Sequence, residues 1–115
     1  MSFLQENFSF MNDRRNTLRK NYKSKVSLQL NEIIKGYGYT KDICVGGVCI
    51  NSPELFTFLK QDQADQILNV MVEVSLISES LTLQGTIIRV NAFEKELVIS
   101  ISQISNPTRW MWLCK

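Results

Sequence analysis

Histidine is absent from the 115-residue sequence, and its absence excludes several kinds of catalytic site. Without an imidazole, the chain cannot carry a Ser-His-Asp triad or another histidine-based acid–base catalyst. Cys44, Cys49 and Cys114 follow no spacing typical of a zinc site, and a fourth ligand would have to be a carboxylate. We therefore expect no metal, no cofactor and no enzymatic activity, and we expect all three thiols to be small buried side chains.

Long apolar runs and a basic leader are also missing. No apolar run approaches the roughly 20 residues that a transmembrane helix needs. The N-terminus carries Glu6 and polar residues instead of the basic segment that opens a signal peptide. An odd number of cysteines without a secretory signal is typical of a reducing compartment. These features predict a cytoplasmic protein with no membrane insertion.

The composition is that of a compact globular protein. Apolar residues make up 44% of the chain and charged residues 21%, which argues against a disordered, collagen-like or coiled-coil protein. A chain of this length has room for one domain.

The net charge of +2 is unevenly distributed along the chain. Residues 1–25 contain six basic and two acidic side chains, a balance of +4, whereas residues 26–115 contain seven basic and nine acidic ones, a balance of −2. A short basic segment on a mildly acidic body predicts a local anion site. It does not predict a face for duplex nucleic acid, which needs many phosphate contacts. The alternative interpretation is a solvated basic arm.

Alternation of apolar and polar residues predicts an all-β fold. Strands are expected at 26–30, 39–44, 48–50, 70–76, 81–90 and 97–102. We expect a turn at Gly36–Gly38, a polar loop at 61–66 and a bulge at Gly85. Asn51-Ser52-Pro53 offers a cap for a helix over 54–59, and Asn91 begins the last hairpin turn.

A short C-terminal helix is predicted from Pro107, which suits the first helical position. We expect Trp110 and Trp112 on this helix to cover an open end of the β-body, with a stacking platform for bases as the rival interpretation. The pattern as a whole predicts a small six-stranded antiparallel β-barrel, since closure removes exposed sheet edges. In this division, residues 1–20 form an N-terminal arm and residues 21–115 form the barrel with its helix.

Two short motifs point to a ligand. The first, DRRNTLR, spans Asp13–Arg19 and lies directly before the first predicted strand. The second, DICVGG, spans Asp42–Gly47 at a corner between two strands. In this order, inside a β-rich chain, they resemble the motifs of the PilZ domain, which has R-R-x-x-x-R ahead of its barrel and D/N-x-S-x-x-G at a strand corner. The resemblance extends from about residue 13 to the C-terminus.

The resemblance implies a PilZ-like barrel that binds cyclic di-GMP, a bacterial second messenger. Arg15 and Arg19 match the family's R-x-x-x-R pair. Arg14 matches the additional arginine that, in the family, accompanies uptake of a stacked pair of ligand molecules. The physics of arginine agrees, because its planar fork pairs with phosphates and with the O6/N7 edge of guanine.

The corner motif would complete this site. Asp42 can accept hydrogen bonds from the N1–H and N2 edge of guanine. Gly47 matches the family glycine and is expected to supply a positive φ and close backbone approach, with Gly46 adding freedom. Cys44 departs from the pattern because it replaces the family serine. Losing one neutral hydrogen bond would weaken binding about tenfold at most. Taken alone, Asp42 and the glycines would be interpreted as an ordinary turn between strands.

Three functions follow from these patterns. The first is a cyclic di-GMP receptor in which the ligand orders the arm and changes a surface that an unidentified protein effector reads. The second is a degenerate adaptor that uses its hydrophobic termini and binds no nucleotide. The third is a binder of single-stranded nucleic acid, against which the acidic balance of the barrel argues.

Overall fold

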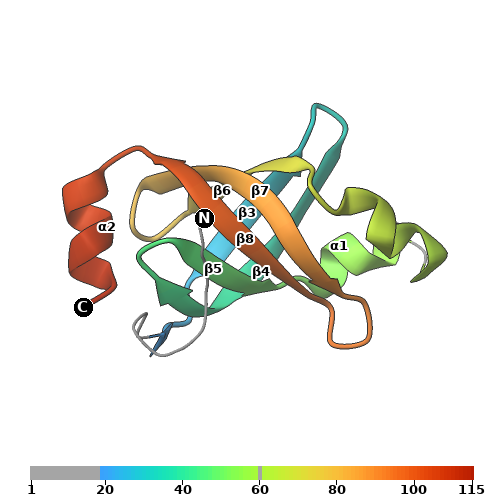
Figure 1. The fold of residues 1–115 in the computed structure, drawn as a ribbon, viewed down its shortest axis with the longest axis horizontal. Helices are drawn as coiled ribbons and strands as arrows, with labels where there is room; N and C mark the ends of the chain where they lie inside the picture. The colour runs from blue at the N-terminus through green and yellow to red at the C-terminus, as the bar shows by residue number, and fades with distance from the viewer. Residues whose placement is uncertain (1–18, 60) are drawn as a thin grey trace, which may run out of the picture.

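The structure is a computed structural model that describes residues 19–59 and 61–115. Arg14 and Arg15 therefore lie outside the described residues. The elements, drawn in Figure 1, are β2 (Lys20–Asn21), β3 (Lys25–Leu30), β4 (Ile34–Cys44), β5 (Gly47–Asn51), α1 (Pro53–Phe58), the 3-10 helix η1 (Gln61–Ile67), β6 (Met71–Leu76), β7 (Leu81–Asn91), β8 (Glu96–Ile104) and α2 (Pro107–Leu113).

Six strands form a closed antiparallel barrel, as the alternation predicted. The order around it is β4-β3-β6-β7-β8-β5, and pairing of β5 with β4 closes the ring. The short strand β2 is additional and pairs with β4 beyond the end of β3. In Figure 1, α2 lies at one end of the barrel and α1 at the other.

The core follows from the period of two along each strand. Val26, Leu28 and Leu30 of β3 face inward and are at most 1% exposed, and β6 buries alternate residues in the same way. Trp110 of α2 is completely buried, which confirms that this tryptophan covers the end of the barrel. Trp112 is 70% exposed, so the prediction that both tryptophans pack there is wrong for Trp112.

The expected turn at Gly36–Gly38 is wrong, because β4 runs straight through it. A Cβ on Gly38 would lie 2.4 Å from the carbonyl oxygen of Asn51, and one on Gly36 would lie 3.4 Å from Leu55 Cβ. These glycines leave room for the chain that enters α1. The turn occurs earlier, where Asn31 has a φ of 51° and its side chain accepts a hydrogen bond of 2.8 Å from the N–H of Ile33.

The remaining local predictions mostly agree with the structure. Ser52 caps α1 by accepting from the N–H of Leu55, and the strand bulge occurs at Gln84–Gly85. The prediction of a polar loop at 61–66 is wrong, because the segment forms η1, in which Ala64 and Ile67 are buried. Their apolar side chains tie this segment to the barrel.

The thiols differ from the prediction in part. Cys49 is 6% exposed, but Cys44 and Cys114 are only half-buried, and all three are free. Among residues 19–59 and 61–115, no group of three or more cysteine and acidic side chains is placed to hold a metal ion. In the same ranges, no helix has the length and apolarity needed to cross a membrane.

Candidate functional site

The last residue of the arginine motif, Arg19, lies beside the corner motif along one edge of β4. Strand β2 pairs Lys20 with Ile43 and Asn21 with Asp42, so the chain that follows the arginine motif runs antiparallel to the corner motif. Extending this register by one residue sets Arg19 opposite Cys44. Between β2 and β3 the chain stays against β4, since Thr40 N–H donates to the carbonyl of Ser24 and Tyr22 N–H donates to that of Lys41. The described end of the basic segment is therefore fixed beside the predicted site.

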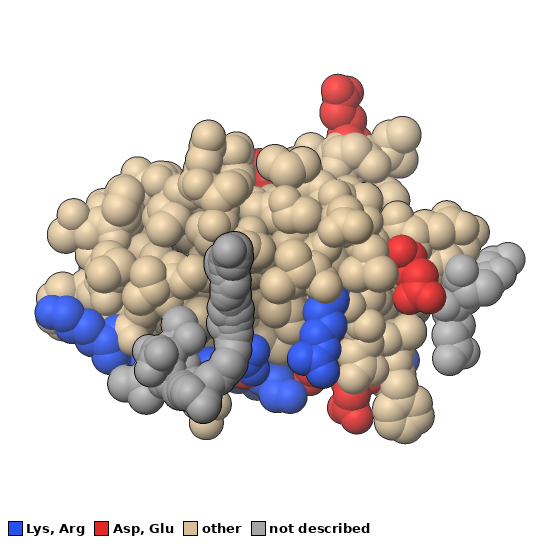
Figure 2. Space-filling model, in the orientation of Figure 1, with Lys and Arg blue, Asp and Glu red and all other residues tan. Residues whose placement is uncertain are grey.

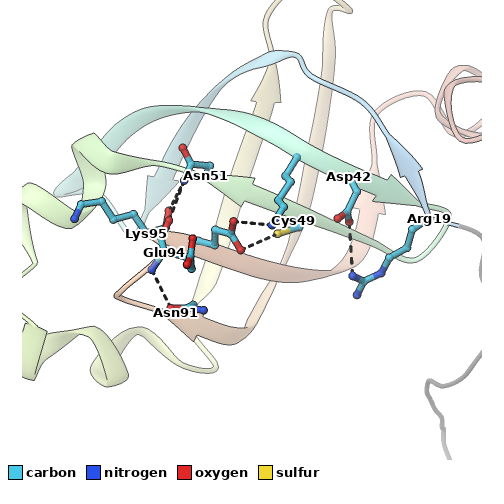
Figure 3. A network of polar contacts seen from close by, with 9 residues as sticks. Arg19, Asp42, Cys49, Asn51, Asn91, Glu94 and Lys95 are labelled. Atoms are coloured by element: carbon cyan, nitrogen blue, oxygen red, sulfur yellow. Dashed lines mark hydrogen bonds and ion pairs between the residues drawn. The ribbon is translucent and has the colours of Figure 1, made fainter.

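Arg19 and Asp42 form the centre of this site (Figure 3). The guanidinium Nη1 lies 4.0 Å from the Oδ1 of Asp42. The arginine side chain is 60% exposed, whereas the aspartate side chain is 17% exposed. Because a long contact with an exposed side chain contributes little stability, the guanidinium is free to turn toward an anion while the carboxylate stays in place.

The β4–β5 turn lies next to this pair and is held from two sides. The indole Nε1 of Trp110 donates to the carbonyl of Val45 at 3.0 Å, and the N–H of Ile101 donates to the carbonyl of Gly46 at 3.0 Å. A Cβ on Gly46 would meet nothing within 4 Å, so the outer side of the turn is open to an approaching group. The turn thus combines a fixed backbone with free space outside it.

Gly47 does not have the expected backbone conformation. None of the chain's five glycines, all of them described, has a positive φ. Gly47 instead opens β5, where a Cβ would lie 3.1 Å from the carbonyl oxygen of Ile99 and 3.7 Å from Cys44 Sγ. Close packing against β8 is the physical reason for a glycine at this position.

A second group of polar side chains lies on the same outer face, along β4, β5 and β8 (Figure 3). Lys41 Nζ forms an ion pair of 2.9 Å with Glu96, and Cys49 lies between this pair and Asp42. Burial, followed by the negative charges of Asp42 and Glu96, raises the pKa of the Cys49 thiol to about 11. Cys49 is therefore a protonated, unreactive thiol at neutral pH.

Sequence reasoning missed the contacts that join this site to α2. Lys20 Nζ donates to the carbonyl of Leu113 at 3.0 Å, at the end of that helix. Tyr22 donates to Glu79, which also pairs with Arg109 of α2 at 2.9 Å. Lys20 was visible as part of the basic run, but no local signal indicates its partner, because the two residues are 93 positions apart.

The site does not coincide with the cavity at the opposite end of the barrel. A hollow of about 360 Å³ lies between β3, β4, α1 and η1, where Leu30, Ile34 and Phe58 line it. Arg19, Asp42 and the β4–β5 turn take no part in that lining. Those of the candidate residues that the structure describes, from Arg19 to the β4–β5 turn, lie at an open surface instead.

Comparison with solved structures defines the architecture. The PilZ domain of CeSA from a cellulose-synthesizing bacterium matches with a TM-score of 0.59 at 19% identity, covering 84% of this chain and 94% of that one. The chain has the PilZ fold.

A second solved structure has the same architecture. The Bacillus subtilis inhibitor of motility, MotI/DgrA, matches with a TM-score of 0.57 at 15% identity. The match covers 90% of this chain and 50% of that protein, so this chain corresponds to about half of its length. No protein-family model and no curated protein sequence matches this chain. The PilZ fold is therefore recognised from the structure, at low sequence identity to both matches.

Proposed function

We propose that this chain is a cyclic di-GMP receptor whose site is formed by the arginine motif and the β4–β5 corner. The observation that carries the proposal is the position of Arg19 beside Asp42, because one residue from each of two motifs far apart in the sequence become neighbours on one surface. The PilZ fold supports it, since the two motifs stand on this fold in the order that the PilZ pattern has.

The chemistry of the site suits a guanine dinucleotide. Arg19, with Arg14 and Arg15 of the same motif, would pair with the phosphates and with the O6/N7 edges of guanine. Asp42 would accept from the N1–H and N2 edge of a guanine. Gly46 leaves open space for a base, and Cys44 stands where the pattern has a serine. Arg14 adds the option of a stacked pair of ligand molecules.

In this proposal, residues 1–20 act as the ligand-ordered arm and residues 21–115 as the barrel that reads it. A ligand that neutralises the arginines would fix the arm against β4. The contacts of Lys20 with Leu113 and of Val45 with Trp110 connect both sides of the site to α2. Helix α2 exposes Met111 and Trp112, which are 49% and 70% exposed. A protein effector would read the bound state at this helix.

Calorimetric titration with cyclic di-GMP tests the proposal. The wild-type protein should bind, and Arg19→Ala, Arg15→Ala and Asp42→Asn should each weaken binding by about tenfold or more, because each removes charge-assisted hydrogen bonds. Lys95→Ala is the matched control, because it removes an exposed cation in the β7–β8 turn at a distance from the site.

Three outcomes would contradict the proposal. Folded wild-type protein that gives no heat of binding at low salt would exclude the receptor function. Equal losses in Arg19→Ala and Lys95→Ala would show that only general charge matters. Effector capture that is unchanged by Arg15→Ala and Arg19→Ala would favour an adaptor that needs no nucleotide.

A further inference from the structure

The outer face of β3 and β4 carries an alternation of lysine and tyrosine that the proposed receptor site does not use. Tyr37 and Tyr39 point outward from β4 and are 53% and 45% exposed. Lys25 lies across from Tyr39 in the ladder, and Ser27 lies across from Tyr37. The tyrosines therefore stand side by side on one strand, about 6.8 Å apart along it.

Each of these rings has an ammonium group over it. Lys23 Nζ lies 5.0 Å from the centroid of the Tyr39 ring, and Lys25 Nζ lies 5.3 Å from that of Tyr37. Both distances are within the range of a cation–π contact. Lys35 continues the basic row on β4, where it pairs with Gln29 of β3. The face thus presents two aromatic rings together with three cations.

The acidic residues near this face include Glu32 in the β3–β4 turn, and two others are engaged. Glu54 accepts a hydrogen bond of 2.8 Å from the backbone N–H of Tyr37, and Glu96 is paired with Lys41. Glu73 lies on β6, one strand beyond β3, opposite Gln29. Figure 2 shows basic and acidic side chains together along the lower edge of the molecule in this view, whereas the broad face over β7 and β8 carries few charges. The net charge of −2 for residues 26–115 is therefore not spread evenly over the barrel.

We propose that the face formed by Lys23, Lys25, Lys35, Tyr37 and Tyr39 binds single-stranded nucleic acid. Small barrels bind single strands by combining a basic surface with aromatic rings on which successive bases stack. Here the ammonium groups of Lys23 and Lys25 would leave the ring faces to contact phosphates, and the rings of Tyr37 and Tyr39 would then receive neighbouring bases. Binding through rings and backbone phosphates tolerates any base sequence.

The residues on this face favour a single strand over an anionic membrane. A membrane-binding surface needs large apolar side chains beside its cations so that they can enter the lipid boundary. Apart from Ile33 in the turn at one end of this face, the most exposed apolar side chains lie elsewhere: Phe58 on α1, Phe93 in the β7–β8 turn and Trp112 on α2. Between the lysines and tyrosines, the face carries Ser27 and Gln29 instead.

Fluorescence anisotropy with a labelled oligothymidine of about 12 nucleotides tests the proposal, at a salt concentration of about 50 mM. The test variant combines Tyr37→Thr with Tyr39→Thr. Threonine is suited to a strand, so this variant removes both rings and keeps residues that favour the strand. We expect these changes to weaken binding at least fivefold per ring, on the order of the stacking contribution of one base. Tyr37→Phe with Tyr39→Phe keeps the rings and should bind like the wild type.

Charge is tested separately through the salt dependence. Replacing Lys23 and Lys25 by Gln should reduce the slope of log K against log salt by up to about 1.4, at roughly 0.7 for each phosphate contact on a single strand. Lys95→Gln, in the β7–β8 turn, is the matched control and should leave the slope unchanged. An equal change of slope in the Lys23/Lys25 variant and in Lys95→Gln would contradict the assignment of the phosphate contacts to this face.

Further outcomes separate this proposal from the receptor function. Asp42→Asn should weaken the binding of cyclic di-GMP and leave the binding of the oligonucleotide unchanged. Tyr37→Thr with Tyr39→Thr should weaken the binding of the oligonucleotide and leave that of cyclic di-GMP unchanged. The proposal fails if Tyr37→Thr with Tyr39→Thr binds the oligonucleotide normally, or if a duplex of the same length binds as well as the single strand. It also fails if phosphatidylserine vesicles bind the protein and the oligonucleotide does not.

Discussion

The indole Nε1 of Trp110 donates a hydrogen bond of 3.0 Å to the backbone carbonyl of Val45. Trp110 is completely buried in α2, and Val45 belongs to the turn that carries Cys44 and Gly46. The end of the barrel, the C-terminal helix and the proposed ligand site are thus one packed unit. A change in the helix is expected to reach the site through this bond.

Trp110→Phe is predicted to destabilise the barrel. The variant leaves the Val45 carbonyl without its donor and removes part of a fully buried side chain. The free energy of unfolding should fall by about 2–4 kcal/mol. Urea denaturation measures it, with Trp112→Phe as the control, because Trp112 is 70% exposed and its replacement should cost less than about 0.5 kcal/mol. Equal losses in the two variants would contradict the packing described above.

Cys44→Ser is predicted to tighten cyclic di-GMP binding if the proposed site is correct. The hydroxyl is a better donor and acceptor than the thiol, so the gain should be up to about tenfold. Calorimetry compares the variant with the wild type and with Cys44→Ala, which should bind no better than the wild type. Unchanged affinity in both Cys44→Ser and Arg15→Ala would mean that the site lies elsewhere.

Much of the fold could be predicted because its signals are local. Alternation in Val26–Leu30 and Val72–Leu76 predicted β3 and β6. The cap at Asn51-Ser52-Pro53 and the proline at position 107 predicted the starts of both α-helices. These patterns reflect which side chains face the core and which backbone groups need a partner. They require no knowledge of where the rest of the chain lies.

What could not be predicted depends on contacts between distant segments. Gly38 looks like a turn residue, but its lack of a Cβ matters because the carbonyl of Asn51 approaches it in the fold. The two-residue strand β2 has no alternation to detect, although it aligns Arg19 with Asp42. The partner of Lys41 lies 55 positions away, at Glu96. The motifs indicated the members of the candidate site, and the pairing of β2 with β4 supplied its geometry.

Gly85→Ala is predicted to be far more damaging than Gly46→Ala. A Cβ on Gly85 would lie 2.2 Å from the carbonyl oxygen of Ser100 and 2.8 Å from Ile99 Cγ2, so β7 and β8 would have to separate. The free energy of unfolding should fall by about 3 kcal/mol or more. Gly46 has a negative φ and no atom within 4 Å of the added Cβ, so its variant should retain most of its stability. Thermal unfolding monitored by circular dichroism compares the two, and similar midpoints would refute the bulge packing.

The Tyr22–Glu79 hydrogen bond is predicted to make stability depend on pH at both extremes. Burial, and then the hydrogen bond to Glu79, raises the pKa of Tyr22 to about 12, and the same bond, followed by that of Arg109, lowers the pKa of Glu79. A raised tyrosine pKa gives stability that is complete below the ordinary value near 10 and is lost as the pH rises toward about 12. A lowered glutamate pKa gives stability that is complete above the ordinary value near 4.3 and is lost as the pH falls below it.

Tyr22→Phe should therefore lower the free energy of unfolding by about 1–3 kcal/mol between roughly pH 5 and 10 and progressively less outside that window. Denaturation curves from about pH 3 to about pH 12 measure the difference. Tyr39→Phe on the exposed face serves as the control, and a cost of Tyr22→Phe that is the same at both extremes as in the middle of this range would disprove the linkage.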